Sequence, residues 1–342
     1  MPGPTVFAIG DFVASILLFI LPNRTSERIR ENTSPRNVYV LREAMKIKCD
    51  KPRMTLFEGV FATLLFDLAL FGTNNRIING LIYLFTTIQN SWDTPFKSKA
   101  EAERAISEFC NRLDIQQSPW IWDKLPTEYT SLNDFFSRTY LHFPRLGTGE
   151  ILSPACCTLQ IYNNDAMMKT LLIKGCKYDI DRVGLPKEDI NAYASHHVIL
   201  GYLSPKDYHR VHSPISGKCI HCKMEGEESL SASVKFFGGK FNILNENKRL
   251  VIVLETSEGL RVALVIVGGV GVNTITYERS IVGKMIQKGQ ELSAFRAGGS
   301  AFAMFSTKPL HLVHELMEVA ERAMGDNVEV QVGETLCQHL HN

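Results

Sequence analysis

The pattern of hydrophobic and polar positions divides the chain into a helix-like first part and a strand-like second part. In residues 101–113, apolar residues recur every three or four positions, with charged residues between them. The apolar positions are Ala102, Ile106, Phe109, Cys110 and Leu113. This spacing is typical of an amphipathic helix, and we expect residues 1–125 to be mainly helical.

From about residue 150 the pattern changes to short runs rich in β-branched residues, separated by Gly, Pro and Asn. These runs are residues 159–162, 170–173, 198–203, 249–255 and 261–267. Their spacing favours an antiparallel β domain over alternating βαβ units. A helix is predicted over 309–324 and a final strand over 328–332. The predicted fold class is α+β, with a helical N-terminal region at 1–125 and a compact, mainly antiparallel β domain at 126–342.

Three apolar runs lie near the start of the chain, at 5–22, 56–71 and 77–87. Asp11 interrupts the first run and Asp67 the second. A carboxylate near the bilayer midplane costs about 3 kcal/mol, and the third run is only a few turns long, so no run predicts a convincing membrane span. Two interpretations stay open. The runs either form a helical subdomain with its own core, or they are interfacial helices that place the protein on a membrane surface, followed by the basic residues Arg24, Arg28 and Arg30.

Composition and charge narrow the classes of function. Lys and Arg (37) almost balance Asp and Glu (36), for a net charge of +1, so no overall field attracts nucleic acid. Eight Cys in 342 residues are too few for a disulfide scaffold, and we expect an intracellular protein.

The segment 203–217 reads L-S-P-K-D-Y-H-R-V-H-S-P-I-S-G and carries His209 and His212. Positions three apart on an extended segment face opposite sides, so one imidazole can act as a base while the other serves a neighbouring cavity. The alternative is a pair of loop histidines without chemistry. Cys219 and Cys222 complete an H-x2-H-x6-C-x2-C pattern, which permits a zinc site. Strand geometry opposes convergence of these residues, and we expect no metal.

Residues 296–300 read R-A-G-G-S and lie between two strand-like runs. The segment is either a simple turn or a strained backbone in which the Ser300 hydroxyl attacks the preceding carbonyl, since Gly permits such a close approach. No Gly stands two residues after Ser300, so the nucleophile elbow of a hydrolase is absent. The sequence also lacks a P-loop and a G-x-G-x-x-G pattern, which removes the commonest nucleotide-binding classes.

Taken together and in order, the segments from about residue 130 to about residue 336 resemble the phosphatidylserine decarboxylase family. Members of this family are pyruvoyl-dependent lyases made as self-cleaving proenzymes. The resemblance rests on N-D-F-F-x-R from Asn133, K-G-x-x-Y from Lys174, the segment 203–217, N-E-N-K-R-L from Asn245, the K-G-x-E-L…G-G-S stretch that ends at Ser300, and V-G-E-T-L from Val332.

The resemblance implies a covalent pyruvoyl cofactor made from Ser300. The Ser300 hydroxyl attacks the Gly299 carbonyl, the chain is cut between Gly299 and Ser300, and the new terminus becomes a pyruvoyl group that acts as an electron sink for carboxylate loss. His212 matches the base that activates the serine for cleavage. His209 matches the histidine associated with decarboxylation. The large and small chains are expected to stay associated in one β fold.

The implied activity is the decarboxylation of phosphatidylserine to phosphatidylethanolamine, a step of phospholipid biosynthesis, by an intracellular, membrane-associated enzyme. An alternative is the decarboxylation of a free amino acid, as in other enzymes of the superfamily. The sequence leaves the organelle and the formation of a homodimer open.

One departure from the family pattern concerns Cys156. The family reads S-P-x-D-G where this chain reads S-P-A-C-C at 153–157, so Cys156 stands in the place of the aspartate that orients the histidine. Loss of such a carboxylate removes several kcal/mol of catalytic effect, and a thiolate replaces it poorly. A further hypothesis is therefore an unprocessed, non-catalytic protein that binds lipid or a protein partner with the inherited pocket.

Overall fold

The computed structural model describes the chain in separate stretches. They are residues 39–40, 91–115, 121–162, 164–165, 170–173, 176–227, 243–269, 275–296, 300–321 and 328–338. The three apolar runs near the start of the chain and Gly299 lie outside these stretches. No helix within them is long and apolar enough to cross a membrane.

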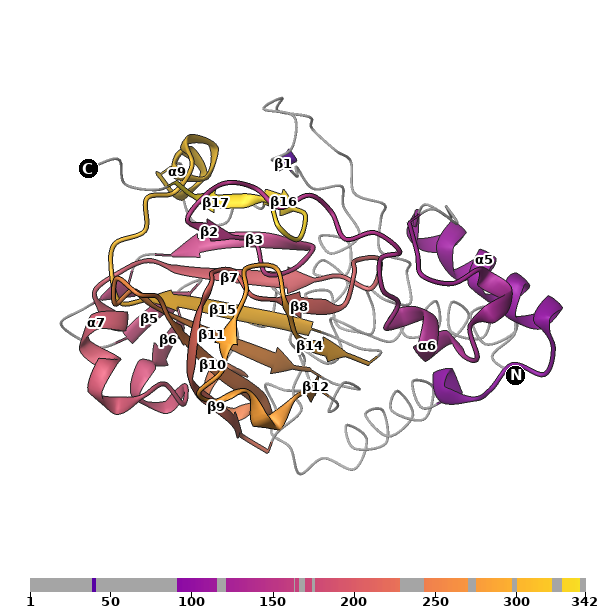
Figure 1. Ribbon diagram of the computed structural model, residues 1–342, viewed down its shortest axis with the longest axis horizontal. Helices are drawn as coiled ribbons and strands as arrows, with labels where there is room; N and C mark the ends of the chain where they lie inside the picture. Colours follow the sequence, from indigo (N-terminus) through magenta and orange to yellow (C-terminus); the bar gives the residue numbers. More distant parts are fainter. Residues whose placement is uncertain are drawn as a thin grey trace, which may run out of the picture.

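A nine-stranded sheet forms the centre of the molecule (Figure 1). Its strands, in spatial order, are β1 (Tyr39–Val40), β16 (Val328–Val330), β3 (Cys157–Tyr162), β7 (Val198–Leu203), β15 (Ser300–Ser306), β11 (Arg261–Gly268), β10 (Arg249–Glu255), β9 (Gly217–Glu225) and β13 (Met285–Ile286). Every neighbouring pair is antiparallel except β1 and β16. This arrangement confirms the predicted antiparallel β domain.

Three smaller sheets accompany the large one. They are β12 (Ile275–Tyr277), β14 (Glu291–Phe295) and β8 (Arg210–His212); β17 (Thr335–Cys337) and β2 (Ile151–Leu152); and β4 (Asn164–Asp165), β5 (Thr170–Ile173) and β6 (Cys176–Asp179). Figure 1 shows β8 and β14 on the side of the molecule where the helices α5 (Lys99–Leu113) and α6 (Leu132–Phe136) lie. Both histidines of the segment 203–217 therefore lie at or beside this side of the sheets.

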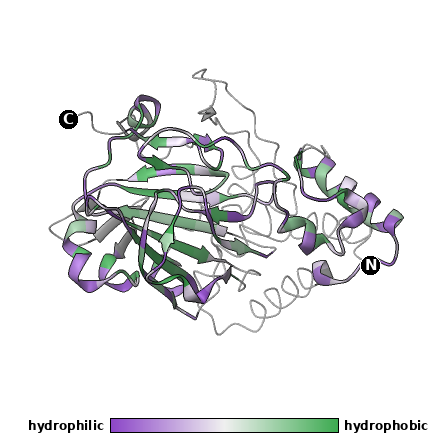
Figure 2. Ribbon diagram, viewed as in Figure 1, coloured by the Kyte–Doolittle hydropathy of each residue, from purple (hydrophilic) through white to green (hydrophobic). Residues whose placement is uncertain are grey.

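The central strands are buried on both faces because their sequences are continuous apolar runs. In β10, Leu250 and Ile252 belong to one hydrophobic core, whereas Val251 and Val253 belong to a second core on the opposite face. These strands are among the most hydrophobic parts of the ribbon (Figure 2). The other α-helices in the described stretches are α7 (Ile190–Ala194), α8 (Ile243–Glu246) and α9 (His314–Glu321). Helix α7 contributes Tyr193 to the second core, so this face of the sheet is covered.

Helix α5 confirms the helix predicted over 101–113. The hydroxyl of Ser98 caps its start by accepting the backbone N–H of Glu101, an arrangement that typically stabilises a helix by about 1 kcal/mol. Its buried residue Ile106 shares a small aromatic core with Phe135 of α6. The two helices therefore form one helical unit beside the sheets.

The helix predicted over 309–324 begins five residues later than expected, at His314. The backbone N–H of Val313 donates to the carbonyl of Leu336 at 2.9 Å, and Leu312 forms a β-bridge with Cys337. These pairings hold the residues before His314 in an extended conformation against β17.

The strand predicted over 328–332 ends at Val330 and is not the last strand. The backbone N–H of Glu334 donates to the carbonyl of Gln331 at 3.2 Å, and Gly333 has a positive φ of 83°. This turn reverses the chain, and β17 follows it.

Candidate active site

His209 lies directly before β8 and is fully buried. Its Nδ1 is 2.8 Å from the carbonyl oxygen of Asp207. Because a carbonyl can only accept a hydrogen bond, we assign the ring proton to Nδ1, which leaves Nε2 with a lone pair. Nε2 is buried and has no hydrogen-bond partner. Burial lowers the pKa of His209 to about 3. The ring is therefore a neutral imidazole with a free lone pair.

His212 is the last residue of β8 and has a different set of contacts. Its Nδ1 is 2.8 Å from the carbonyl oxygen of Gly289, and its Nε2 is 3.1 Å from the hydroxyl oxygen of Tyr208. By the same reasoning Nδ1–H donates to Gly289, and Nε2 accepts the hydrogen of Tyr208. Burial lowers the pKa of His212 below its ordinary value. This imidazole is neutral and oriented at both nitrogens.

Ser300 is the first residue of β15. It lies opposite Gly268 of β11 and Leu203 of β7, in the middle of the nine-stranded sheet. Its Oγ is buried and has no hydrogen-bond partner. Most buried hydroxyls are hydrogen-bonded, and a buried hydroxyl that is not calls for an explanation such as reactivity or strain.

The chain around Ser300 is attached at two points to the segment that carries the histidines. On one side, the backbone N–H of Phe295, the last residue of β14, donates to the carbonyl of His209 at 2.9 Å. On the other side, Ser300 itself pairs with Leu203 at the end of β7. Phe295 and Ser300 are therefore both bonded or paired to the segment that carries the histidines, although these two sequence regions are far apart along the chain.

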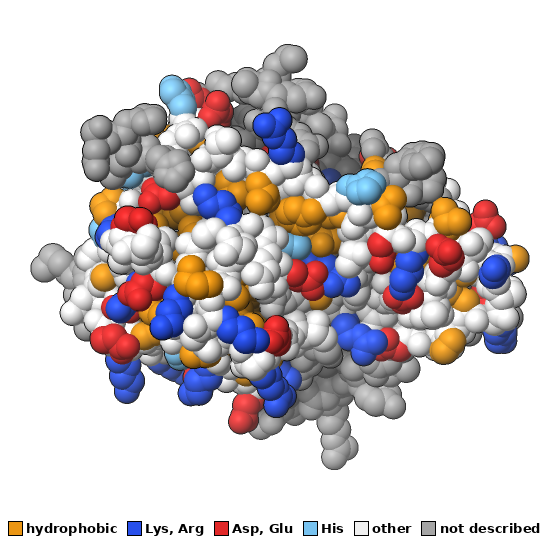
Figure 3. Space-filling view, in the orientation of Figure 1, with side chains coloured by type: hydrophobic (Ala, Val, Ile, Leu, Met, Phe, Trp, Pro, Cys, Tyr) orange, Lys and Arg blue, Asp and Glu red, His pale blue; other side chains and the backbone are white. Residues whose placement is uncertain are grey.

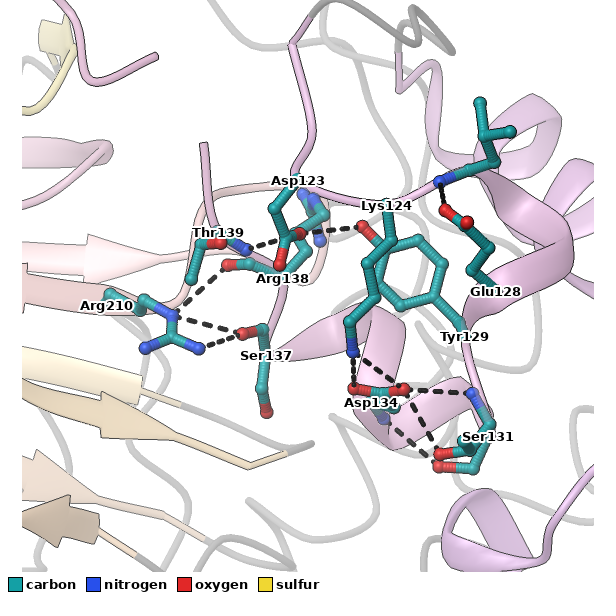
Figure 4. A network of polar contacts seen from close by, with 12 residues as sticks. Asp123, Lys124, Glu128, Tyr129, Ser131, Asp134, Ser137, Arg138, Thr139 and Arg210 are labelled. Atoms are coloured by element: carbon teal, nitrogen blue, oxygen red, sulfur yellow. Dashed lines mark hydrogen bonds and ion pairs between the residues drawn. The ribbon is translucent and has the colours of Figure 1, made fainter. Parts of the chain in front are cut away.

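The helical unit is joined to this part of the sheets through Arg210. Its guanidinium donates to the carbonyl oxygens of Ser137 at 2.7 Å and Arg138 at 3.3 Å, and it forms an ion pair with Glu291 at 2.7 Å. Figure 4 shows Arg210 reaching from its strand toward the end of α6. The ring centroid of Phe136 lies 3.9 Å from that of His209. The N-D-F-F segment of the family motif thus covers one face of a candidate catalytic histidine.

A cavity of about 480 Å³ lies between the helical unit and the three-stranded sheet formed by β12, β14 and β8. Its walls include Asp93, Asn133, Ser137, Arg210, Thr276 and Arg296. Arg296 is separated from Ser300 by only three residues, and its ion pair with Asp93 (3.2 Å) is about half exposed to solvent. The cavity has a polar lining.

Cys156 is buried but does not take the orienting position on His212. Its Sγ lies 3.4 Å from the Tyr140 hydroxyl, 3.3 Å from Gln331 Oε1 and 3.4 Å from the Val332 backbone N. Burial raises the pKa of the thiol to about 11, so the thiol is neutral. The nitrogens of His212 are already engaged by other groups, and the thiol forms no hydrogen bond with them.

The structure does not bring together the residues of the possible zinc-binding pattern, which are His209, His212, Cys219 and Cys222. Cys219 and Cys222 lie on β9, opposite Leu254 and Ile252 of β10, and the Cys219 thiol donates to the carbonyl of His221 at 3.4 Å. In the part of the chain that the structure describes, no group of three His, Cys, Asp or Glu side chains is placed to hold a metal ion.

Comparison with known proteins agrees with the ordered motifs. A family model described as phosphatidylserine decarboxylase matches residues 132–338, more than half of the chain. The phosphatidylserine decarboxylase proenzyme of Fusobacterium nucleatum subsp. nucleatum is 30% identical over 217 residues, which cover 62% of this chain and 70% of the relative. The proenzyme of Bacillus thuringiensis (strain Al Hakam) is 31% identical over 211 residues, which cover 60% and 78%.

These matches, together with the β fold and its buried histidines, define the protein as an enzyme of the carboxy-lyase class. More specifically, the chain belongs to the phosphatidylserine decarboxylase family.

Proposed function

We propose that the protein is a proenzyme that cuts itself between Gly299 and Ser300 and then decarboxylates phosphatidylserine to phosphatidylethanolamine. The observation that carries this proposal is the buried Ser300 Oγ without a hydrogen-bond partner. A hydroxyl left unpaired in the core costs about 1–3 kcal/mol, and the Ser300 hydroxyl, unlike the unpaired hydroxyl of Ser293, belongs to the residue that directly follows the Gly-Gly pair of the family motif. The substrate is proposed from the names of the relatives.

The self-cleavage begins with Ser300. Its Oγ attacks the carbonyl carbon of Gly299 and replaces the peptide nitrogen, which forms an ester. Removal of the Ser300 Cα proton then breaks the Cβ–Oγ bond, which releases the Gly299 carboxylate and leaves a dehydroalanine. Water replaces the nitrogen of that residue, ammonia leaves, and a pyruvoyl group remains. His212 accepts the hydroxyl proton at Nε2, which requires that the Tyr208 hydroxyl release this nitrogen.

Once formed, the pyruvoyl group supplies an electron sink for the loss of the substrate carboxylate. We assign to His209 the transfer of the proton that the reacting carbon takes up in this step. Its Nε2 is unpaired in the intact chain, so it can accept a proton from the substrate amino group when that group reacts and then deliver this proton to the carbon that loses carbon dioxide. The ring of Phe136 and the Asp207 carbonyl hold the imidazole in one orientation.

The self-cleavage is tested by comparing two buried serines. Ser300→Ala removes the attacking hydroxyl, whereas Ser293→Ala removes another buried hydroxyl that also lacks a partner, on β14. We expect wild-type and Ser293→Ala protein to yield a fragment that begins at residue 300 with a keto-acyl terminus, as measured by intact mass. Ser300→Ala should remain a single chain.

An uncut wild-type chain of 38.5 kDa from the native source would overturn the proposal and favour the non-catalytic alternative. A cut wild-type protein that releases carbon dioxide from a free amino acid, but not from phosphatidylserine, would leave the chemistry in place and correct the substrate.

A further inference from the structure

A loop between α6 and β2 exposes apolar and basic side chains next to one another. Leu141 is 46% exposed and Phe143 is 38% exposed, and His142 and Arg145 are exposed as well. Single exposed apolar residues are normal on a protein surface, but two within three positions, flanked by basic residues, form a small amphipathic surface. We call residues 141–145 the docking loop.

The docking loop is held firmly and is continuous with the candidate active site. The backbone N–H of Leu141 donates to the Ile121 carbonyl at 2.9 Å, and Tyr140 forms a β-bridge with Trp122. The ring centroid of Phe143 lies 4.5 Å from that of His212. One aromatic ring therefore joins the exposed surface to a buried histidine of the site.

The charge of the docking loop is not neutralised locally. Neither His142 nor Arg145 forms an ion pair within the described stretches, whereas Arg210 and Arg296, nearer the cavity, are both paired with carboxylates. Figure 3 shows hydrophobic side chains gathered on the viewed face between the sheets and the helices α5 and α6, with a histidine beside them. Exposed apolar side chains combined with unpaired basic groups are suited to an anionic lipid surface.

We infer that the docking loop contacts the surface of an anionic phospholipid bilayer. Leu141 and Phe143 enter the interfacial layer, and Arg145 lies against the head groups. Because His212 lies directly behind Phe143, a head group at the bilayer surface would reach the site without leaving the membrane interface. This inference rests on the proposed function for its biological meaning, although the binding itself can be measured separately.

The first experiment measures partitioning of the full chain onto vesicles of phosphatidylcholine alone, with phosphatidylglycerol, or with phosphatidylserine. Leu141→Ser should lower partitioning about fivefold on all vesicles to which the wild type binds, since about half of a leucine side chain loses its apolar contact. Arg145→Gln should lower it about fivefold on both anionic vesicles and leave phosphatidylcholine binding unchanged. Met285→Ser, at a residue 62% exposed on β13, is the matched control and should have no effect.

The second experiment is local, so that it is insensitive to any other lipid-binding segment. Tryptophan is introduced as Leu141→Trp or as Met285→Trp, and fluorescence is measured on vesicles that contain brominated phosphatidylcholine and phosphatidylglycerol. Bromine quenches only indoles that enter the bilayer, so the Leu141→Trp protein should lose clearly more fluorescence than the Met285→Trp protein.

Equal quenching in the two tryptophan variants, or unchanged partitioning of Leu141→Ser and Arg145→Gln, would overturn the inference. Binding to phosphatidylserine vesicles without binding to phosphatidylglycerol vesicles would also overturn it, because recognition would then lie in a substrate pocket. All of these measurements are repeated in the Ser300→Ala background, which is not expected to process. Loop-dependent binding in that background supports the docking loop even if the decarboxylase proposal fails.

Discussion

The surroundings of His209 and His212 differ, although the two residues are only three positions apart. His209 lies against Phe136, away from the surface, and its Nε2 is free. His212 lies behind the half-exposed Phe143, and both of its nitrogens are hydrogen-bonded. A catalytic base needs both an available lone pair and a fixed orientation. His209 has the available lone pair, whereas His212 has the more fully determined orientation.

The same comparison explains how His212 is oriented without an aspartate. The Gly289 carbonyl fixes the proton on Nδ1, which is the geometric part of the role that a carboxylate has in a Ser-His-Asp arrangement. A carbonyl carries no net charge, so it stabilises the imidazolium ion less than a carboxylate would. We therefore expect that His212 is correctly oriented for self-cleavage but that the cleavage is slow.

Replacing His209 and His212 in turn tests the proposed difference between their roles, and of all the variants these two are expected to change the reaction rates most. His212→Gln should slow chain scission by at least about 100-fold, the usual contribution of a general base. His209→Gln should leave scission measurable and slow carbon dioxide release by at least about 100-fold. Scission is followed on denaturing gels during synthesis, and decarboxylation is followed with labelled substrate on protein that has already been cut.

The matched control for this pair is His221→Gln. His221 also has a buried Nε2 without a partner, but it lies on β9, and its replacement should change neither step. If His209→Gln abolishes scission while His212→Gln permits it, the free lone pair is the processing base and the two assignments are exchanged.

The acid sensitivity of folding provides a second test of the buried imidazole. The pKa of His209 falls from its ordinary 6.5 to about 3 in the folded protein. Between these pH values the unfolded chain binds a proton that the folded chain does not, so the free energy of unfolding decreases as the pH falls. The dependence is at most about 1.4 kcal/mol per pH unit.

This dependence is measured as a difference between wild type and His209→Gln, by denaturant unfolding at several pH values. The difference is needed because burial raises the pKa of the neighbouring Asp207 to about 6, and protonation of Asp207 therefore stabilises the folded state as the pH falls through the same range. Relative to His209→Gln, the wild type should lose stability between about pH 6.5 and pH 4. A constant difference would show that His209 binds a proton in the folded protein as readily as in the unfolded chain.

The hydroxyl of Tyr208 offers a smaller test on the other histidine. A hydrogen bond to the neutral ring disfavours protonation, so Tyr208→Phe should raise the pKa of His212 toward its ordinary value. The acidic limb of the scission rate would then move to higher pH, because the base must be unprotonated. Tyr193→Phe, on α7 in the second core, is a control that should leave the profile unchanged. A shift to lower pH would contradict the assigned hydrogen-bond direction.

Much of the fold could be predicted because the central strands are continuous apolar runs. The bounds of β7, β10 and β5 agree with the predicted runs. Strand β9 was not predicted, because Lys218, Cys219, His221 and Cys222 do not alternate in polarity. The register shift opposite Val253 and Leu254 breaks the period of two in this strand, and a bulge of this kind leaves no simple sequence signal.

The site was only partly predictable for a different physical reason. Ser300, His209 and His212 stand in recognisable local motifs, so they could be named from the sequence. One partner that orients His212 comes from a distant segment, since Gly289 is 77 positions away. The cover of His209 by Phe136 follows from how α6 packs against β8, which no local pattern encodes.

The replacement of Cys156 carries the smallest expected effect and tests whether the thiol acts on His212 at all. Because the thiol contacts Tyr140, Gln331 and Val332 instead of His212, Cys156→Ala should change the scission rate by less than about threefold, below 1 kcal/mol. The same substitution should lower the free energy of unfolding by about 1–3 kcal/mol, because it leaves the buried backbone N–H of Val332 without its acceptor.

The paired variant Cys156→Asp sharpens this test. A carboxylate at this position can accept from the Tyr140 hydroxyl and the Val332 N–H, yet both nitrogens of His212 are already occupied, so scission should again stay within about threefold of wild type. An inert wild type whose scission is restored by Cys156→Asp would show that the missing aspartate is decisive, and that Gly289 and Tyr208 do not suffice to prepare His212. A wild type that cuts itself, with both Cys156 variants close to it, would show that two neutral groups, the Gly289 carbonyl from a distant segment and the nearby Tyr208 hydroxyl, have taken over the orientation of the base.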